Sequence, residues 1–228
     1  MIAARVAAVR DRIARAAARA GRVAAEVTLV AVSKTHPPER VREAVAAGLQ
    51  DFGENRVQEA EGKIEALSHL RGQVRWHLIG HLQSNKSRPA VALFDRIHSV
   101  DDLKLAQRLE RAAEEARRPL RVLVQVKVGD EESKAGVDPG RLFALLDAIR
   151  GFKRVHAEGL MAIPPFLEDA EEVRPHFARL RQLRDEALLR GLLRGRELSM
   201  GMSHDLEVAI EEGATMVRVG TAIFGERK

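Results

Sequence analysis

Short apolar runs and longer amphipathic segments alternate along the whole chain. In the run LRVLVQVKV, residues 120–128, apolar residues stand at every second position, which is the spacing of a β-strand. The longer segments repeat apolar residues at intervals of three and four, which is typical of a helix that buries one side. The pattern predicts eight strands, at residues 29–33, 50–53, 75–80, 95–98, 120–128, 155–161, 197–200 and 215–220.

A predicted helix follows each of these strands except the last, and one more helix precedes the first strand. Candidate N-caps are Ser84, Ser203 and a capping box over residues 99–102, while Pro37 and Pro38 suit the start of a helix. The predicted helices cover residues 1–20, 37–48, 56–67, a segment from about 84, and residues 99–116, 138–150, 168–190 and 203–212.

Strands that alternate with helices form parallel βαβ units, and eight strands predict an α/β fold, a single (β/α)8 barrel of the TIM type. No linker rich in Ser or Gly interrupts the pattern, so one domain over residues 1–228 is expected. The helix at residues 1–20 is additional to the barrel, and we expect its apolar stripe to pack on it. A doubly wound open sheet remains the alternative, because local periodicity does not show whether the last strand pairs with the first. The apolar stripe of the additional helix at residues 1–20 consists of Ile2, Val6, Val9, Ile13 and Ala17.

Composition narrows the class of function. Lys and Arg number 38 against 33 Asp and Glu, the two signs are interleaved, and aromatic residues make up only 4%, so no nucleic-acid partner is expected. An interaction module that uses the basic surface has only this small excess in its favour. The absence of cysteine excludes disulfides and thiolate chemistry. No apolar run reaches the roughly 18 residues that span a bilayer, so we expect a cytoplasmic protein without membrane association.

Polar residues of the predicted strands fall on the inward face near the carboxyl ends, where barrel sites lie. Lys34 continues the face of Val30 and Val32, which leaves its amine partly desolvated. Desolvation favours the neutral amine, the form that attacks a carbonyl to make a Schiff base. A lysine that reaches out to solvent from the strand end is the alternative. Other polar residues on inward faces are Arg75, His77, Gln125, Lys127 and Arg218.

Two turns of small residues follow the last two predicted strands, at residues 199–201 and 220–221. Barrels commonly bind phosphate at this place through backbone N–H groups. A carbonyl-capturing lysine opposite a phosphate site indicates pyridoxal 5′-phosphate (PLP). Arg218 near the pyridine nitrogen would act only as a donor, which leaves that nitrogen unprotonated and weakens the cofactor as an electron sink. Met161, Met200 and Met202 stand beside strand ends, which favours a place in the lining of the pocket for Met161 and Met202, with a role as core filler as the alternative.

Five blocks carry a resemblance to a known family: VSKTHP, FGENRVQE, WHLIGHLQSNK, GLMAIPP and SMGMSHDLEVAIEEGATMVRVGTAIFG. Together they resemble the pyridoxal phosphate homeostasis protein family from about residue 29 to residue 225. These proteins are single-domain barrels similar to the amino-terminal domain of alanine racemase, that is, PLP fold type III without the C-terminal β-domain. The resemblance implies that Lys34 forms the internal aldimine, that Asn55 lies beside the cofactor and that Arg218 contacts the ring nitrogen. The phosphate contacts that it implies are Ser199, Gly201, Gly220 and Thr221, and the further pocket positions are His77 and Met161.

The resemblance also implies a function in intracellular PLP homeostasis. The protein would bind, buffer or deliver the cofactor without a defined turnover, as a monomer, with apo forms of PLP-dependent enzymes as recipients. Alanine racemase needs a second base, a tyrosine from a separate β-domain, and this chain has no tyrosine. A two-base racemase of that design is therefore excluded. The alternative function is a PLP-dependent racemase, decarboxylase or aldolase that acts on a small amino acid.

Several other residues are candidates for chemistry. His77 and His81 have a spacing that could suit zinc, although no third ligand is evident. Lys127 and Lys134 are interpreted as solvated residues at the rim, with a role as secondary acceptors of the aldehyde as the alternative. Glu54 and Asp205 are interpreted as charges at helix N-termini rather than as bases.

Overall fold

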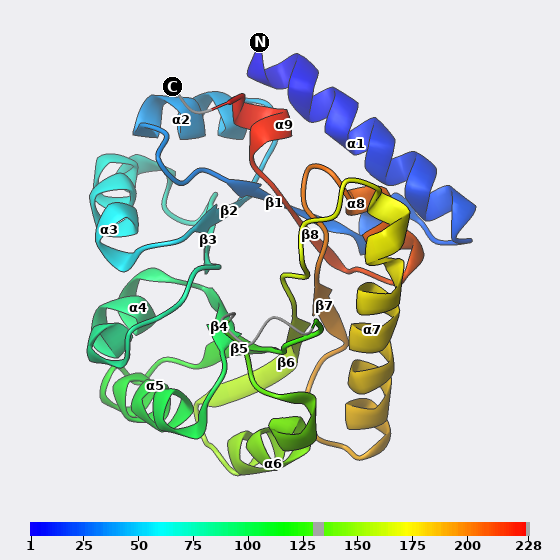
Figure 1. Ribbon diagram of the computed structural model, residues 1–228. Helices are drawn as coiled ribbons and strands as arrows, with labels where there is room; N and C mark the ends of the chain where they lie inside the picture. The colour runs from blue at the N-terminus through cyan, green and yellow to red at the C-terminus, as the bar shows by residue number, and fades with distance from the viewer. Residues whose placement is uncertain (130–134, 227–228) are drawn as a thin grey trace.

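The computed structural model describes residues 1–129 and 135–226, and the strands of these residues form one closed barrel of eight parallel strands in chain order (Figure 1). The first strand pairs with the last, with Thr28 beside Met216 and Ala31 beside Val219. This pairing confirms the predicted (β/α)8 barrel and decides against the open sheet. The strands are β1 (Thr28–Val32), β2 (Asp51–Glu54), β3 (Arg75–Leu78), β4 (Arg96–Val100), β5 (Leu120–Gln125), β6 (Val155–Met161), β7 (Glu197–Ser199) and β8 (Met216–Val219).

The helices surround this barrel (Figure 1). Short 3-10 turns add to them, among them Ser84–Lys86 and Ala170–Val173. None of the described helices is both long and apolar enough to cross a membrane. The helices are α1 (Ile2–Arg19), α2 (Pro38–Ala46), α3 (Val57–Ala66), α4 (Ser87–Leu93), α5 (Leu103–Glu115), α6 (Pro139–Arg150), α7 (Arg174–Leu189), α8 (Leu206–Glu211) and α9 (Thr221–Phe224).

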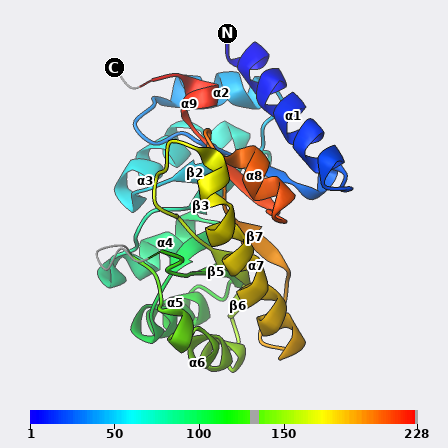
Figure 2. The same cartoon turned by 45° about the vertical axis from the view of Figure 1, so that its right-hand side comes forward.

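Helix α1 lies outside the barrel against α8, α9 and α2, and the turned view shows it beside α8 again (Figure 2). The stripe expected from the sequence is buried there. Arg12 forms a salt bridge between α1 and α8, in which its guanidinium donates to both carboxylate oxygens of Glu207 at 2.5 and 2.7 Å. The same side chain donates to the carbonyl of Ser203 at 3.0 Å. Helix α1 is thus connected to the loop that follows β7.

The two faces of the strands have different surroundings. Outward residues such as Ala31 and Val217 join the large apolar core beneath the helices. Inward residues form a second, smaller apolar cluster inside the barrel, made of Val30, Leu123, Met161 and Met216. The alternation read from the sequence therefore assigns these residues to the correct faces. The inward face also holds the polar groups of the site.

Three predicted caps are wrong, and each error has a local cause. Strand β4 continues through Val100, so Ser99 is a strand residue whose hydroxyl donates to the Gly80 carbonyl at 2.7 Å. Asp102 alone caps α5 by accepting from the Leu105 N–H at 2.7 Å. Ser84 opens a 3-10 turn instead of α4.

The third wrong cap is Ser203. Helix α8 begins only at residue 206, and the Ser203 hydroxyl faces the N–H of Ala222 on α9 at 3.4 Å. Strand β5 is also shorter than expected, because it ends at Gln125 and only a single bridge, from Val126 to Val137, continues its pairing. Helix α9 was not expected, since four residues are too few to show a periodic pattern.

Candidate functional site

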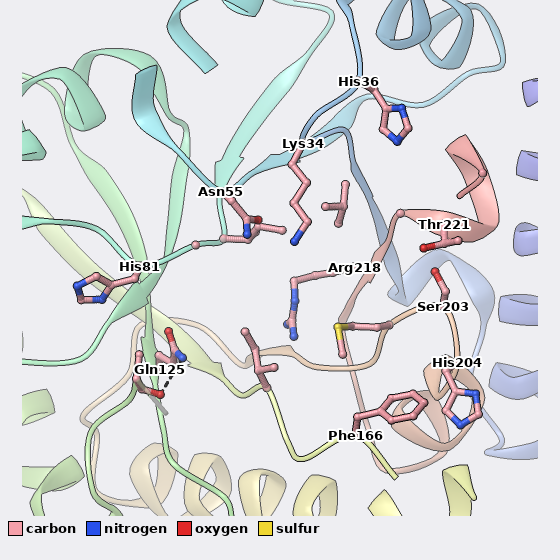
Figure 3. Close-up of a pocket in the computed structure, with 18 residues that line it drawn as sticks. Lys34, His36, Asn55, His81, Gln125, Phe166, Ser203, His204, Arg218 and Thr221 are labelled. Atoms are coloured by element: carbon pink, nitrogen blue, oxygen red, sulfur yellow. Dashed lines mark hydrogen bonds between the residues drawn. The ribbon is translucent and has the colours of Figure 1, made fainter. Parts of the chain in front are cut away.

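A cavity of 510 Å³ opens at the carboxyl ends of the strands (Figure 3). The loops after β1, β2, β3, β6 and β7 line it, together with residues of β5 and β8 and the start of α9. This is the place where barrels of this type carry their sites. Six of the ten sequence-predicted site residues line the cavity: Lys34, Asn55, Met202, Arg218, Gly220 and Thr221.

Lys34 lies in a tight turn directly after β1. The His36 N–H donates to the Ser33 carbonyl at 3.0 Å and closes the turn, and Thr35 has a φ of 67°, a left-handed conformation that a β-branched residue rarely adopts. The side chain of Lys34 extends into the cavity toward Arg218 (Figure 3). The turn therefore ends the strand so that the amine is presented to the cavity.

A buried ionic network supports the Lys34 turn from behind. Lys63 on α3 donates from Nζ to the Ser33 carbonyl at 2.6 Å, and to Glu54 and Glu59 at 2.7 Å each. Glu59 in turn accepts the N–H of Thr35. The strained residue of the Lys34 turn is thus bonded directly to α3, which offsets the cost of its conformation.

Glu54 has a different role from the one expected. Its side chain is fully buried at the end of β2 and accepts from the Ser33 hydroxyl at 2.6 Å as well as from Lys63. Burial raises the pKa of Glu54, and the bonds from Lys63 and Ser33 oppose that rise. The interpretation as a helix N-terminal charge is therefore wrong, because Glu54 is part of the support of the Lys34 turn.

Arg218 faces Lys34 across the cavity although it is only 4% exposed (Figure 3). Its Nη1 donates to the Ser199 hydroxyl at 2.7 Å and its Nη2 to the Ala162 carbonyl at 2.9 Å. Burial lowers the pKa of Arg218 to about 10, so the guanidinium still carries its charge near neutral pH. It presents a fixed cation that can only donate hydrogen bonds.

The far end of the cavity is built by the loop after β7 and the start of α9. The hydroxyl groups of Ser203 and Thr221 lie near each other there (Figure 3). The Met202 N–H donates to Asp205 at 2.6 Å and holds the loop in shape. Hydroxyls and the first N–H groups of a helix are suitable donors to a phosphate. Asp205 stands at the N-cap position of α8, as expected for a charge at a helix N-terminus, but its carboxylate bonds to the loop and not to the helix.

Gly201 contributes to this end indirectly. Its φ is 88°, and a Cβ on it would lie 2.5 Å from the Cβ of Ala209 on α8. Only glycine allows the loop to pack so closely on α8. Gly201 does not line the cavity, whereas its neighbours Met202 and Ser203 in the same loop do.

The remaining predicted residues lie deeper in the barrel. Ser199 is fully buried, and its hydroxyl is engaged by Arg218 and His98. Met161 belongs to the interior apolar cluster below the cavity. His77 bonds to Asp51 and to His98 in the barrel interior, so the structure does not bring it to the cavity.

Several lining residues were not given a role in the site by the sequence. Phe166, which is 74% exposed at the mouth, packs at a tilt on His204, and His36 stacks on Phe224. Phe166, His204 and His36 lie in the loops that follow strands at the carboxyl end of the barrel, and this position along the chain is the signal that could have found them. Other lining residues outside the expected cofactor set include His81, Gln125, Ile163 and Ser203.

The other candidates from the sequence separate in space. His81 lines the cavity while His77 points into the barrel, so they do not form one site. Among residues 1–129 and 135–226, no group of three or more His, Cys, Asp or Glu side chains could hold a metal ion. Lys127 is half-buried outside the lining of the cavity, and Lys134 lies outside the described residues.

Comparison with known proteins gives a consistent result. Residues 5–228 match the family model described as "Alanine racemase, N-terminal domain". The chain is 50% identical over 226 residues to the pyridoxal phosphate homeostasis protein of Pseudomonas aeruginosa, covering 99% of this chain and 96% of that protein. It is 47% identical over 224 residues to the protein of the same name from Aquifex aeolicus, covering 98% and 97%.

Solved structures agree. PipY from Synechococcus elongatus is 45% identical and is known without PLP, with a TM-score of 0.89, and with PLP bound, with a TM-score of 0.87. Both alignments cover 99% of this chain and all of PipY. A D-threonine aldolase from Filomicrobium marinum has a TM-score of 0.73 at 20% identity over 59% of its length, which shows a shared fold and no more.

Proposed function

We propose that this chain, which belongs to the pyridoxal phosphate homeostasis protein family, binds pyridoxal 5′-phosphate in the cavity described above. We further propose that it takes part in the homeostasis of this cofactor. The observation that carries the proposal is the placement of Lys34 and Arg218 opposite each other in a cavity with hydroxyl donors at one end. When bound, PLP supplies an aldehyde that condenses with a primary amine to form a Schiff base with loss of water.

The residues present fit this group. Lys34 offers the amine, and Arg218 offers a donor where the ring nitrogen would lie. Ser203 and Thr221 offer hydroxyl donors suited to the phosphate. A cavity of 510 Å³ is in the range that small-molecule sites occupy. Asn55 lines the cavity on the side of Lys34 and would contact the ring (Figure 3).

Arg218 sets the kind of chemistry that the bound cofactor would support. A guanidinium cannot accept a proton and gives no acidic proton to a pyridine nitrogen at neutral pH. The ring nitrogen would stay unprotonated and the cofactor would be a weak electron sink. This property suits a protein that holds PLP better than one that stabilises carbanions.

The proposed role is therefore that of a carrier without catalytic turnover, which acts as a monomer and delivers PLP to apo forms of PLP-dependent enzymes. The names of the homologous proteins refer to homeostasis and support a role in the supply of the cofactor. The alternative, a PLP enzyme that acts on a small amino acid, predicts sustained exchange of α-protons when the protein is incubated with amino acids in deuterated water. The carrier predicts no such exchange, together with activation of an added apo-enzyme.

The binding proposal is tested by spectroscopy and labelling. Titration of the purified apo-protein with PLP should produce a visible absorption band, and borohydride should attach the cofactor to the peptide that contains Lys34. Lys34→Ala should lose most of this band, whereas Lys127→Ala, at a half-buried lysine outside the cavity lining, should keep it. A label on Lys127, or an unchanged band in Lys34→Ala, would refute the assignment.

A further inference from the structure

A chain of hydrogen bonds runs through the barrel interior, away from the cavity. It begins at Arg218, which donates to the Ser199 hydroxyl at 2.7 Å. Ser199 Oγ lies 2.9 Å from His98 Nδ1, and His98 Nε2 lies 2.9 Å from His77 Nδ1. His77 Nε2 lies 3.0 Å from Asp51 Oδ1. All five side chains are buried, and they come from β8, β7, β4, β3 and β2.

The two ends of this chain determine the direction of every bond in it. A guanidinium only donates, and an ionised carboxylate only accepts. Burial opposes the ionisation of Asp51, but the bonds from His77 and Arg75 lower its pKa to about 2, so it is charged near neutral pH. His77 therefore donates from Nε2 to Asp51 and, if neutral, accepts at Nδ1.

The remaining proton positions follow. His98 must donate from Nε2 to His77, so its Nδ1 accepts the hydroxyl hydrogen of Ser199. The oxygen of Ser199 is then left to accept from Arg218. In this arrangement Ser199, His98 and His77 each donate once and accept once within the chain, and none of their side-chain polar hydrogens lacks an acceptor.

A protonated His77 would donate from Nδ1 to His98, which would reverse the direction of the bonds between His77, His98 and Ser199 and leave one hydrogen without an acceptor. Both His98 and Arg218 would then donate to the Ser199 oxygen, and the Ser199 hydroxyl hydrogen would have no acceptor within the chain. Burial lowers the pKa of His77. Burial lowers the pKa of His98 further, and the nearby positive charges of Arg218 and Arg96 also lower it. Asp51 and Asp95 oppose this shift at His77 only in part. Both imidazoles are therefore neutral.

We propose that Asp51 is a positioning residue for Arg218, acting through the two neutral imidazoles and the Ser199 hydroxyl. Among the residues that the structure describes, the acceptors of the guanidinium are two uncharged oxygens, those of Ser199 and Ala162. Bonds in such a chain polarise one another, strengthening each by roughly 10–30%. The carboxylate at the amino end of the barrel thereby makes the Ser199 oxygen a better acceptor and holds Arg218 in its orientation toward the cavity. The consequence for the cofactor rests on the proposed function, whereas the proton positions do not.

The proton positions are tested on the unmodified protein without cofactor. Nitrogen-15 NMR of the histidine rings near neutral pH should show His77 and His98 as neutral Nε2–H tautomers. A proton on Nδ1 of either ring would overturn the proposal. This measurement holds even if PLP does not bind, so it separates failure of the inference from failure of the proposed function.

The distant effect is tested by removing the charge. Asp51→Asn keeps an acceptor of the same shape but a weaker one, because bonds to charged acceptors are about twice as strong. We expect the His77 Hε2 resonance to move upfield and the affinity for PLP to fall roughly fivefold. Asp95→Asn is the matched control, since Asp95 carries the same charge just before β4 and bonds to Trp76 N–H and Arg118 outside the chain.

Two outcomes decide the distant effect. If Asp51→Asn changes PLP affinity and absorption no more than Asp95→Asn, Asp51 does not position Arg218 and the proposal fails. Asp51 also pairs with the half-exposed Arg75, so Arg75→Met should leave both readouts unchanged. If Asp51→Asn does not fold, Ser199→Ala breaks the same chain beside Arg218 and should give the same shift in affinity; an unchanged affinity there overturns the proposal equally.

Discussion

Replacing Lys63 by Met removes the ammonium group at the centre of the network behind the Lys34 turn. Met retains most of the volume of the lysine side chain and adapts to irregular space, so packing is largely preserved. What is lost is a donor to three oxygens at 2.6 to 2.7 Å, from a side chain that is only 7% exposed. The change therefore isolates the ionic contribution of the network.

The expected magnitude follows from the burial of the two carboxylates. Glu54 is fully buried, and its second oxygen, Oε2, has no partner among the described residues, so without Lys63 it becomes an unpaired buried charge. Breaking such a pair costs about 3–5 kcal/mol. Glu59 is 27% exposed, and water compensates it in part, so its share is at most about 1 kcal/mol. We expect Lys63→Met to lower the free energy of unfolding by roughly 3–5 kcal/mol near neutral pH.

The penalty should depend on pH with a definite sign. Burial already raises the pKa of Glu54, and loss of the ammonium group removes the main opposing effect. A carboxyl whose folded pKa exceeds its unfolded value of about 4.3 binds its proton more readily in the folded state, so acid favours folding. The destabilisation should therefore be largest above the folded pKa of Glu54 and should shrink as the pH falls toward about 4.

The assay is urea unfolding followed by circular dichroism, at neutral and at mildly acidic pH. The matched control is Lys104→Met on the exposed side of α5, which should change stability by no more than about 0.5 kcal/mol. The reasoning is refuted if Lys63→Met is within about 1 kcal/mol of the wild type near neutral pH, or if its penalty grows in acid.

Three further predictions concern the rest of the site. Gly201→Ala should destabilise the protein by more than about 2 kcal/mol, because the new Cβ would lie 2.5 Å from α8 in a left-handed backbone conformation. Gly191→Ala, at a residue with a φ of 66° and no atom near the new Cβ, should cost only about 1 kcal/mol. Thermal unfolding of the two variants checks this difference. Arg218→Lys should weaken PLP binding about tenfold and shift its absorption, because one ammonium nitrogen replaces the two separate guanidinium nitrogens that bond to Ser199 and Ala162. A titration that matches the wild type would contradict the role of the guanidinium. Arg12→Ala should accelerate PLP release roughly fivefold, because it removes the bond to the Ser203 carbonyl that holds the loop after β7. Arg15→Ala removes only an exposed ion pair and should not change the release rate. Equal release rates of the two variants, measured by stopped-flow absorption, would exclude a role for α1 in retaining the cofactor.

Much of the molecule could be predicted from local pattern. Alternation of apolar runs and amphipathic segments predicts the eight strands and the barrel, and period-2 spacing places Lys34 and Arg218 on the inward face. The five sequence blocks identify the family, which the comparisons confirm. These features are determined by spacing along the chain, which needs no knowledge of what lies opposite. Helix ends were less predictable, because the hydroxyls of Ser99 and Ser203 bond to other segments and Ser84 lies in a 3-10 turn before α4.

Only the tertiary structure decides depth and partners. His77 and Arg218 are both inward residues by spacing, yet one lies inside the barrel and the other faces the cavity, since strand register determines the height of each side chain. The pairing of Lys63 with Glu54 also depends on how α3 packs on the end of β2, and nothing in the charge pattern distinguishes it from a surface pair. Side-chain period is a property of one strand, whereas burial and hydrogen-bond partners belong to the closed sheet as a whole.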